Sequence, residues 1–362
     1  MILSRITDLV GHTHMMEIPV SNPNARLFLK LEKFNPGGSM KDRMAISMVD
    51  AAERDGLLRP GGTIVESSSG NTGIGLAIVA AERGYQFIAV VDHHASKDKL
   101  LTMRALGAQL HFVTGVYAEN EVAVVERQET AARLGREIPG AVFMNQSDNP
   151  ANPAGYADLA DAICSEVGSN LRLYVSCAGT GGSITGVGRR LKKIDPKIHV
   201  IAVEPEGSII FGNPPHPYYQ SGTGTPGGDE VGKVMDYSVV DEGITVGDRE
   251  AFATCRFIAR RFGLLIGGST GGALFRALER VNAPEFHGVA VCNVCDGGEK
   301  YLQSIFDDEW LSSRQLLTDQ FTEFLTEAVT RRSWNASIEI SAPSPLTLVR
   351  SVDRHEANIS PH

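Results

Sequence analysis

One lysine and three glycine-rich turns are the features of this 362-residue chain that could do chemistry. Lys41 lies in NPGGSMKDR, residues 35–43, where a glycine-rich turn is expected to become a helix. A lysine needed only for solubility could lie anywhere on the surface, so this position suggests a role for the amine. The turns are SSSGNTG at 67–73, CAGTGGSITG at 177–186 and IGGSTGG at 266–272.

The second turn has the composition of a phosphate-binding loop. Its glycines let the backbone approach an anion, its hydroxyls add donors, and the helix expected to follow presents free N–H groups. These candidate residues are Gly179, Thr180, Gly181, Gly182 and Ser183. The turn is neither a Walker A loop nor the GxGxxG fingerprint, and a plain tight turn is the alternative interpretation.

An amine, a phosphate loop and a polar turn together describe a site for pyridoxal 5'-phosphate. The aldehyde of that cofactor needs a lysine, its phosphate needs a cradle, and its ring needs polar groups that tune it. The three turns are each expected to link a strand to a helix, and ligands collect at such strand ends in open α/β sheets.

Short apolar runs alternate with helical patterns along most of the chain, which predicts a doubly wound, largely parallel α/β fold. The expected strands are 26–34, 62–70, 86–92, 108–115, 171–179, 199–205 and 287–294, and the expected helices are 41–58, 71–84, 97–107, 156–166, 182–195 and 248–263. Residues 206–232, rich in Gly and Pro, should form a long functional loop, and the polar stretch after residue 330 a flexible tail.

Composition excludes several classes of protein. A formal net charge of -9 argues against nucleic-acid binding, and no apolar run is long enough to cross a membrane. The N-terminal residues lack the pattern of a signal peptide, so we expect a cytoplasmic enzyme. Five cysteines form no disulfide framework. Cys292 and Cys295 form a CxxC that could be a redox pair, although packing in a buried strand is favoured, and we expect no metal site.

The motifs resemble those of the cysteine synthase and cystathionine β-synthase family of fold type II pyridoxal phosphate enzymes. The resemblance runs from about residue 8 to residue 310 and is carried by NPGGSMKDR, SSSGNTGIGLA, NQSDNPANP, GTGGSITGV, GGSTGG and GEKYL, in that order. It implies a tryptophan synthase β-like fold with two domains. The larger would comprise 1–41 and 149–330, the smaller and mobile one would be 42–148, and 331–362 would be the tail.

The resemblance also implies a role for each candidate residue. Lys41 would bind the cofactor aldehyde and remove the Cα proton, Asn71 would meet the 3' oxygen, and the 179–183 loop would hold the phosphate. Ser269 would face the ring nitrogen, although capping of the following helix is an alternative. The substrate carboxylate would be held by Ser68, Ser69, Thr72 and Gln146. Asp296-Gly297-Gly298 replaces the family's serine-bearing turn, so we assign no ring contact there.

The expected activity is β-replacement on O-acetyl- or O-phospho-L-serine through an aminoacrylate, with a sulfur or amine nucleophile. A hydroxyl at the ring nitrogen favours this chemistry over transamination, because it makes the ring a weaker electron sink. The alternatives are a cystathionine β-synthase, a serine/threonine dehydratase, and an inactive homologue that acts as a binding partner. Likeness to the phosphoserine-using, siderophore-synthase-like branch of the family favours the phospho ester, with Lys233 and the 222–228 loop as candidates for binding its leaving group. The family also implies a homodimer.

Overall fold

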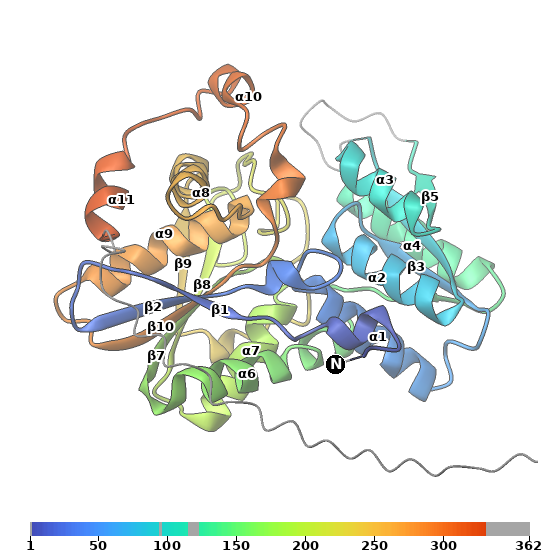
Figure 1. The fold of residues 1–362 in the computed structure, drawn as a ribbon. Coiled ribbons are helices and arrows are strands. Elements are labelled where there is room, and N and C mark those ends of the chain that lie inside the picture. The colour runs from blue at the N-terminus through green and yellow to red at the C-terminus, as the bar shows by residue number, and fades with distance from the viewer. Residues whose placement is uncertain (1, 94–95, 115–122, 331–362) are drawn as a thin grey trace, which may run out of the picture. The chain divides into compact units, whose positions relative to one another are not determined.

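The structure is a computed structural model, and it describes residues 2–93, 96–114 and 123–330. The tail that we expected to be flexible, 331–362, lies outside the described residues. Two sheets form the frame of the described chain, with helices packed against their faces (Figure 1).

The larger sheet has six strands in the order β1-β2-β10-β7-β8-β9. Only the β1–β2 pair is antiparallel, and the other pairs of this sheet are parallel. The bounds are β1 Met15–Ile18, β2 Ala25–Lys30, β7 Leu171–Cys177, β8 His199–Pro205, β9 Glu242–Val246 and β10 Gly288–Asn293. The fold class expected from the alternating pattern is therefore confirmed for this sheet.

Both faces of the larger sheet are buried, which explains why its strands are apolar almost throughout. Along β7, Leu173 and Val175 belong to one apolar core, with α8 and α9. Tyr174 and Cys177 belong to a second core on the opposite face, with α6 and α7. The covering helices are α5 Ala151–Ala154, α6 Ala157–Val167, α7 Gly182–Ile194, α8 Asp248–Phe262, α9 Gly268–Asn282, α10 Asp308–Ser313 and α11 Thr322–Ala328.

The smaller sheet has four parallel strands in the order β5-β4-β3-β6. Its strands are β3 Thr63–Ser67, β4 Gln86–Val91, β5 Gln109–Phe112 and β6 Ala141–Phe143, and its helices are α1 Lys41–Arg54, α2 Asn71–Arg83, α3 Lys97–Ala105 and α4 Val124–Glu137. All of these elements lie within 41–148, but α1 and α2 share a core with α6 and α7. The domain boundaries and the mobility of the smaller part stay predictions.

Short 3₁₀ turns complete the secondary structure; these are η1 Ile6–Leu9, η2 Glu32–Phe34, η3 Gly168–Asn170, η4 Tyr237–Val239 and η5 Gly298–Tyr301. Residues 206–232 contain no helix or strand, as the glycine and proline content predicts. The prediction for the third glycine turn is wrong in one respect. The residues between α8 and α9 form no named strand, and Ile266 makes only an isolated bridge to Gly297. Among the described helices, none is both long and apolar enough to span a bilayer.

Candidate active site

A cavity lies where β7 and the residues after β10 meet the start of α1. It is lined by Met40, Lys41, Asn71, Cys177, Gly179, Ser183, Ser221, Gly222, Ser269, Cys295 and Asp296. The lining therefore joins five of the residues singled out in the sequence, namely Lys41, Asn71, Gly179, Ser183 and Ser269. They lie in helices, and in one loop, that pack on the two sheets, and the sequence separations between them reach more than half the chain.

The turn before Lys41 is shaped by its glycines. Gly38 has φ +69°, and Gly37 lies so close to Asp42 that an added Cβ would lie 2.3 Å from Oδ1. Asp42 in turn accepts a hydrogen bond from the Gly37 N–H, and burial raises its pKa to about 6 against the effect of that bond. Met40 N–H donates to the Cys295 carbonyl at 2.9 Å, which ties the turn to the end of β10. Lys41 is the first residue of α1.

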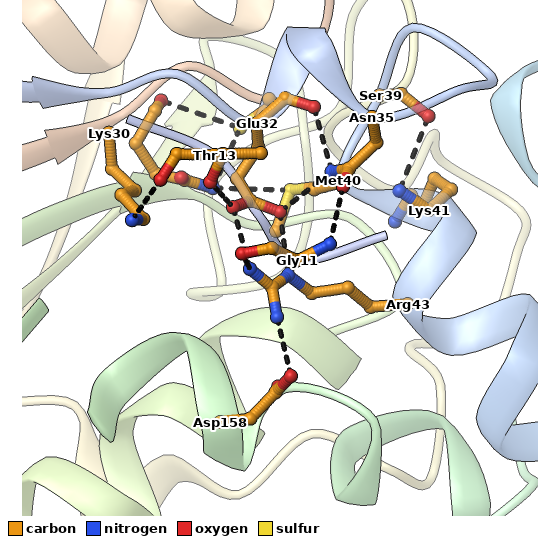
Figure 2. A network of polar contacts seen from close by, with 12 residues as sticks. Gly11, Thr13, Lys30, Glu32, Asn35, Ser39, Met40, Lys41, Arg43 and Asp158 are labelled. Atoms are coloured by element: carbon orange, nitrogen blue, oxygen red, sulfur yellow. Dashed lines mark hydrogen bonds and ion pairs between the residues drawn. The ribbon is translucent and has the colours of Figure 1, made fainter. Parts of the chain in front are cut away.

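A buried ion pair holds the first turn of α1 in place (Figure 2). The Arg43 guanidinium donates to both carboxylate oxygens of Glu32, at 2.7 and 2.9 Å, and to Asp158 at 2.6 Å. The side chains of Arg43 and Glu32 are 2% and 0% exposed. Burial opposes ionisation of Glu32, yet the hydrogen bonds and charge of Arg43 hold the pKa of this carboxyl below its ordinary value. Figure 2 shows this pair beside Lys41 and Ser39.

Replacing Arg43 with alanine should lower the free energy of unfolding by about 3–5 kcal/mol, because Glu32 would be left as an uncompensated buried charge. Urea denaturation at neutral pH measures this change. Arg54→Ala is the matched control, since Arg54 lies on the same helix with a side chain that is 70% exposed. The control should change stability by less than about 0.5 kcal/mol. Equal losses in the two variants would show that the Arg43–Glu32 pair does not stabilise this region.

The glycine loop before α7 has little room for side chains. Gly181 has φ +90°, and a Cβ on it would lie 2.7 Å from Met235. At Gly182, the first residue of α7, an added Cβ would lie 2.0 Å from the Asn152 amide oxygen. Asn152 also donates to the Gln146 carbonyl at 2.6 Å and to Thr180 Oγ1 at 3.5 Å. The loop thus presents backbone N–H groups at the positive end of a 13-residue helix.

Asn71, the first residue of α2, is oriented by two charged residues. Its Nδ2 donates to Asp296 Oδ2 at 2.8 Å, and its Oδ1 accepts from Lys300 Nζ at 2.6 Å. Lys300 also donates to the carbonyls of Gly37 and Gly38, at 2.9 and 3.2 Å, so one amine joins Asn71 to the turn that carries Lys41. Tyr301 OH donates to Asp296 Oδ2 at 2.6 Å.

The residues expected to hold a carboxylate lie around the start of α2, and apart from Asn71 this turn does not line the cavity. Thr72 Oγ1 donates to Gln146 Oε1 at 2.7 Å. Ser68 Oγ accepts from the N–H groups of Gly70 and Gly73, at 3.3 and 3.1 Å. Ser69 Oγ accepts from the buried Arg127 at 3.2 Å. The structure thus brings Thr72 and Gln146 together, while the hydroxyls of Ser68 and Ser69 are engaged by other groups of the chain.

A buried carboxyl lies directly before the 67–73 turn. Glu66, at the end of β3, accepts from the backbone N–H groups of Ser67 and Gln146, at 2.9 and 3.2 Å. Burial raises the pKa of Glu66 to about 8, although these two hydrogen bonds oppose the rise. The folded chain therefore keeps a proton that the unfolded chain releases between its ordinary pKa and about pH 8.

This raised pKa predicts that stability falls with pH. In the unfolded chain the pKa of Glu66 is ordinarily about 4.3, and below this pH its contribution to the free energy of unfolding is fully present. The contribution is lost at up to about 1.4 kcal/mol per pH unit as the pH rises toward the pKa of Glu66 in the folded chain. Glu66→Gln should lose this slope. It should also be less stable at acidic pH, because its amide NH2 faces one of the two N–H donors. Urea midpoints measured across the window test this, with the exposed Glu129→Gln as control. Identical slopes in Glu66→Gln and the wild type would contradict it.

Sequence reasoning missed several residues of the cavity. Cys177, Cys295, Ser221 and Asp296 line it without having been singled out for it, whereas Gly222 belongs to the 222–228 loop named as a candidate for the leaving group. We had assigned no ring contact to Asp296, yet its carboxylate forms part of the wall and orients Asn71. The available signal was the glycine turn after β10, because a polar residue at the carboxyl end of a parallel strand is a candidate for any site there. Lys233, in contrast, does not line the cavity; its side chain is 75% exposed and pairs with Asp148.

Comparison with known proteins identifies the family. The family model described as "Pyridoxal-phosphate dependent enzyme" matches residues 6–296. The chain belongs to this family. It is 61% identical over 317 residues to a protein named "Putative cysteine synthase" from Sinorhizobium fredii, which covers 88% of this chain and 94% of that protein. It is 38% identical to the cystathionine beta-synthase of Apis mellifera over 87% of this chain and 64% of that protein.

Solved structures agree with this membership and confirm the α/β fold class expected from the sequence. O-ureido-L-serine synthase has a TM-score of 0.78 and 34% identity, covering 86% of this chain and 100% of that one. The O-acetylserine dependent cystathionine beta-synthase from Helicobacter pylori has a TM-score of 0.75 and 34% identity, with coverages of 84% and 98%. The resemblance stated from the sequence motifs is therefore confirmed, and the chain is a pyridoxal phosphate-dependent enzyme.

The cavity suits the cofactor of this family. An amine, a side-chain amide, a hydroxyl and a glycine loop at a helix N-terminus are the groups that an aldehyde, a phenolic oxygen, a ring nitrogen and a phosphate require. Asp296 Oδ1 is buried and has no hydrogen-bond partner among the described residues. Because buried polar atoms are nearly always paired, a wall with such an atom fits a cavity that receives a polar ligand.

Proposed function

We propose that this enzyme catalyses β-replacement on an activated L-serine, O-acetyl- or O-phospho-L-serine, with a sulfur or amine nucleophile. The observation that carries this proposal is the single cavity that joins Lys41, Asn71, the glycine loop and Ser269. It is supported by likeness to proteins named as cysteine synthase and as an O-acetylserine dependent enzyme. When bound, pyridoxal phosphate withdraws electrons from the substrate Cα and so makes its proton removable.

Each residue has a part in this proposal. Lys41 holds the cofactor through its amine and then moves the Cα proton. Asn71 would contact the 3' oxygen of the cofactor, and Asp296 and Lys300 keep its amide in one orientation. The backbone N–H groups and hydroxyls of the 179–183 loop hold the phosphate.

Ser269 is the residue that we expect to favour β-replacement over transamination. Its hydroxyl would face the ring nitrogen of the bound cofactor and, unlike a carboxylate, would not keep that nitrogen firmly protonated. A weaker electron sink suits loss of a leaving group from Cβ and is less suited to transamination. Ser269 is buried at the start of α9 and lines the cavity, which supports this assignment.

The substrate carboxylate is assigned to Ser68, Ser69, Thr72 and Gln146 at the start of α2. Binding there requires some of their present hydrogen bonds to be exchanged for bonds to the carboxylate. We propose that this exchange draws the smaller sheet and its helices toward the larger one. Such a closure would exclude water from the reacting centre.

The experiment that tests the function offers the purified enzyme both esters with a panel of nucleophiles. The panel comprises sulfide, thiosulfate, homocysteine and a primary amine, and products are identified by mass spectrometry. We expect an amino acid that carries the nucleophile on Cβ, with O-phosphoserine used at least as well as O-acetylserine. Formation of a keto acid without any adduct would indicate a dehydratase. Bound cofactor without consumption of any substrate would indicate an inactive homologue.

A cystathionine β-synthase is the second candidate, because the chain is 38% identical to the enzyme of that name from Apis mellifera. The reaction with homocysteine distinguishes it, since only a cystathionine β-synthase is expected to use homocysteine in preference to sulfide.

The exposure of Lys233 makes it a poor candidate for binding a phosphate leaving group. This leaves the 222–228 loop, whose Gly222 lines the cavity.

We further propose that the enzyme is a cytoplasmic homodimer. All five cysteines are free, which suits a reducing compartment. The family resemblance supports the dimer. Light scattering of the purified chain measures its mass in solution, and a monomeric mass would contradict this part of the proposal.

A further inference from the structure

Two cysteines that are far apart in the sequence meet in the wall of the cavity. Cys177 is the last residue of β7, and Cys295 follows the neighbouring parallel strand β10. Their sulfur atoms are 3.4 Å apart, and both residues line the cavity together with Lys41 and Ser269. Both are 7% exposed.

The CxxC read from the sequence is therefore not the relevant pair. Cys292 belongs to the apolar core on the α9 side of the sheet, while Cys177 and Cys295 belong to the core on the other side. The partner that Cys295 contacts is Cys177, more than 100 residues earlier in the chain. Only the pairing of β10 with β7 brings these two thiols together.

The two thiols differ in reactivity. The hydrogen bond from Cys295 lowers the pKa of Cys177 against the effect of burial, and the charge of Lys41 lowers it further. The same contact and burial raise the pKa of Cys295. Burial is the main cause of the raised pKa of both Cys292 and Cys255. Because the thiolate is the nucleophilic form, Cys177 is the thiol that most readily attacks an electrophile among these buried cysteines.

We propose that Cys177 and Cys295 form an oxidation site in which a peroxide converts the two thiols to an intramolecular disulfide. The Cys177 thiolate attacks one oxygen of hydrogen peroxide, the O–O bond breaks, and the products are a sulfenic acid and hydroxide. Cys295 sulfur then attacks the Cys177 sulfur, and water leaves as the S–S bond forms. The two thiols lose two electrons and two protons in total, and the peroxide becomes two molecules of water.

The disulfide would change the shape of the cavity. An S–S bond is about 2.05 Å long, so the sulfur atoms must approach each other from their present contact. Cys177 directly precedes the 179–183 loop, and Cys295 N–H donates to Thr270 Oγ1 at 3.0 Å, next to Ser269. The bond would therefore pull the phosphate loop and the start of α9 out of their present alignment. Cofactor bound in the cavity would in turn cover the thiols and slow their oxidation.

The test treats the full-length protein with hydrogen peroxide, once with cofactor bound and once after its removal. Intact mass and a non-reducing peptide map are then recorded. We expect the cofactor-free chain to lose two hydrogen atoms and to yield a peptide linking Cys177 to Cys295, reversibly with dithiothreitol. Its affinity for pyridoxal phosphate should fall at least about tenfold until reduction, and the cofactor-bound chain should oxidise more slowly. The expected loss of cofactor affinity and the slower oxidation of the cofactor-bound chain rest on the proposed function. The peptide that links Cys177 to Cys295 does not.

Variants sharpen the result. Cys295→Ser should leave Cys177 unable to form the bond, so peroxide should add oxygen to it and no hydrogen loss should occur. Cys164→Ser is the matched control, because Cys164 is half-buried on α6 and should leave the linkage intact. A link between Cys292 and Cys295, or added oxygen on Cys177 without any link in the wild type, would overturn the proposal. The wild-type map decides the question even where a variant fails to fold.

Discussion

Lys41→Ala is expected to lower the rate of β-replacement by at least about 10³-fold and to leave the cofactor without a covalent attachment. Loss of a positioned proton-transfer group alone typically costs about 10²–10⁴-fold. The variant also loses the amine that anchors the cofactor aldehyde. The visible absorbance of the purified protein and its rate with O-acetylserine and sulfide measure both effects.

The matched control is Lys233→Ala, which removes a largely exposed lysine that does not line the cavity. Its spectrum and rate should equal those of the wild type. A Lys41→Ala protein with an unchanged visible spectrum and undiminished turnover would show that another amine holds the cofactor.

Gly181→Asp is expected to weaken cofactor binding by at least about 100-fold. The residue has φ +90°, and any Cβ there would lie 2.7 Å from Met235, so the loop before α7 must shift. The new carboxylate would also face a phosphate, and a like-charge contact of this kind costs several kcal/mol, where each 1.4 kcal/mol is about tenfold. Equilibrium dialysis of the cofactor measures the effect.

Gly84→Asp separates the loop from the general cost of a left-handed backbone. Gly84 has φ +75° at the end of α2, but a Cβ there meets no atom within 4 Å. This control should lose some stability and keep its cofactor affinity. If Gly181→Asp folds and binds the cofactor as tightly as the control, the 179–183 loop does not hold the phosphate.

Local patterns in the sequence predicted much of the fold. Alternating apolar strands and helical spacing predicted the parallel sheets, because a buried parallel strand is apolar on both faces and its crossover helix is amphipathic. Glycine before a helix start predicted the turns near Lys41, Asn71 and Ser183, since a tight turn leaves a local signature. The residues before Ser269 were misassigned as a strand, because an apolar pair followed by glycines does not distinguish a strand end from a bridge.

The contacts that depend on strand order were not accessible from sequence. Cys295 reaches Cys177 because β10 lies beside β7 in the larger sheet, and Asp296 reaches Asn71 because the residues after β10 meet the start of α2. The pairing of Arg43 with Glu32 likewise depends on how the turn after β2 folds back on α1. No periodicity or spacing in the sequence encodes these pairings. The deep burial of Glu66 could not be predicted either, because it follows from packing on both faces of the smaller sheet.

The most direct test of the account is to locate the lysine that carries the cofactor. Borohydride treatment of the purified enzyme reduces the lysine–pyridoxal linkage to a stable bond, and peptide mass spectrometry then identifies the labelled residue. Lys99 and Lys300 are the informative competitors, because buried Lys99 and half-buried Lys300 both lie near Asp296 and Lys300 also contacts Asn71. We expect the label on Lys41 alone. A label on Lys99 or Lys300, with Lys41 unmodified, would contradict it.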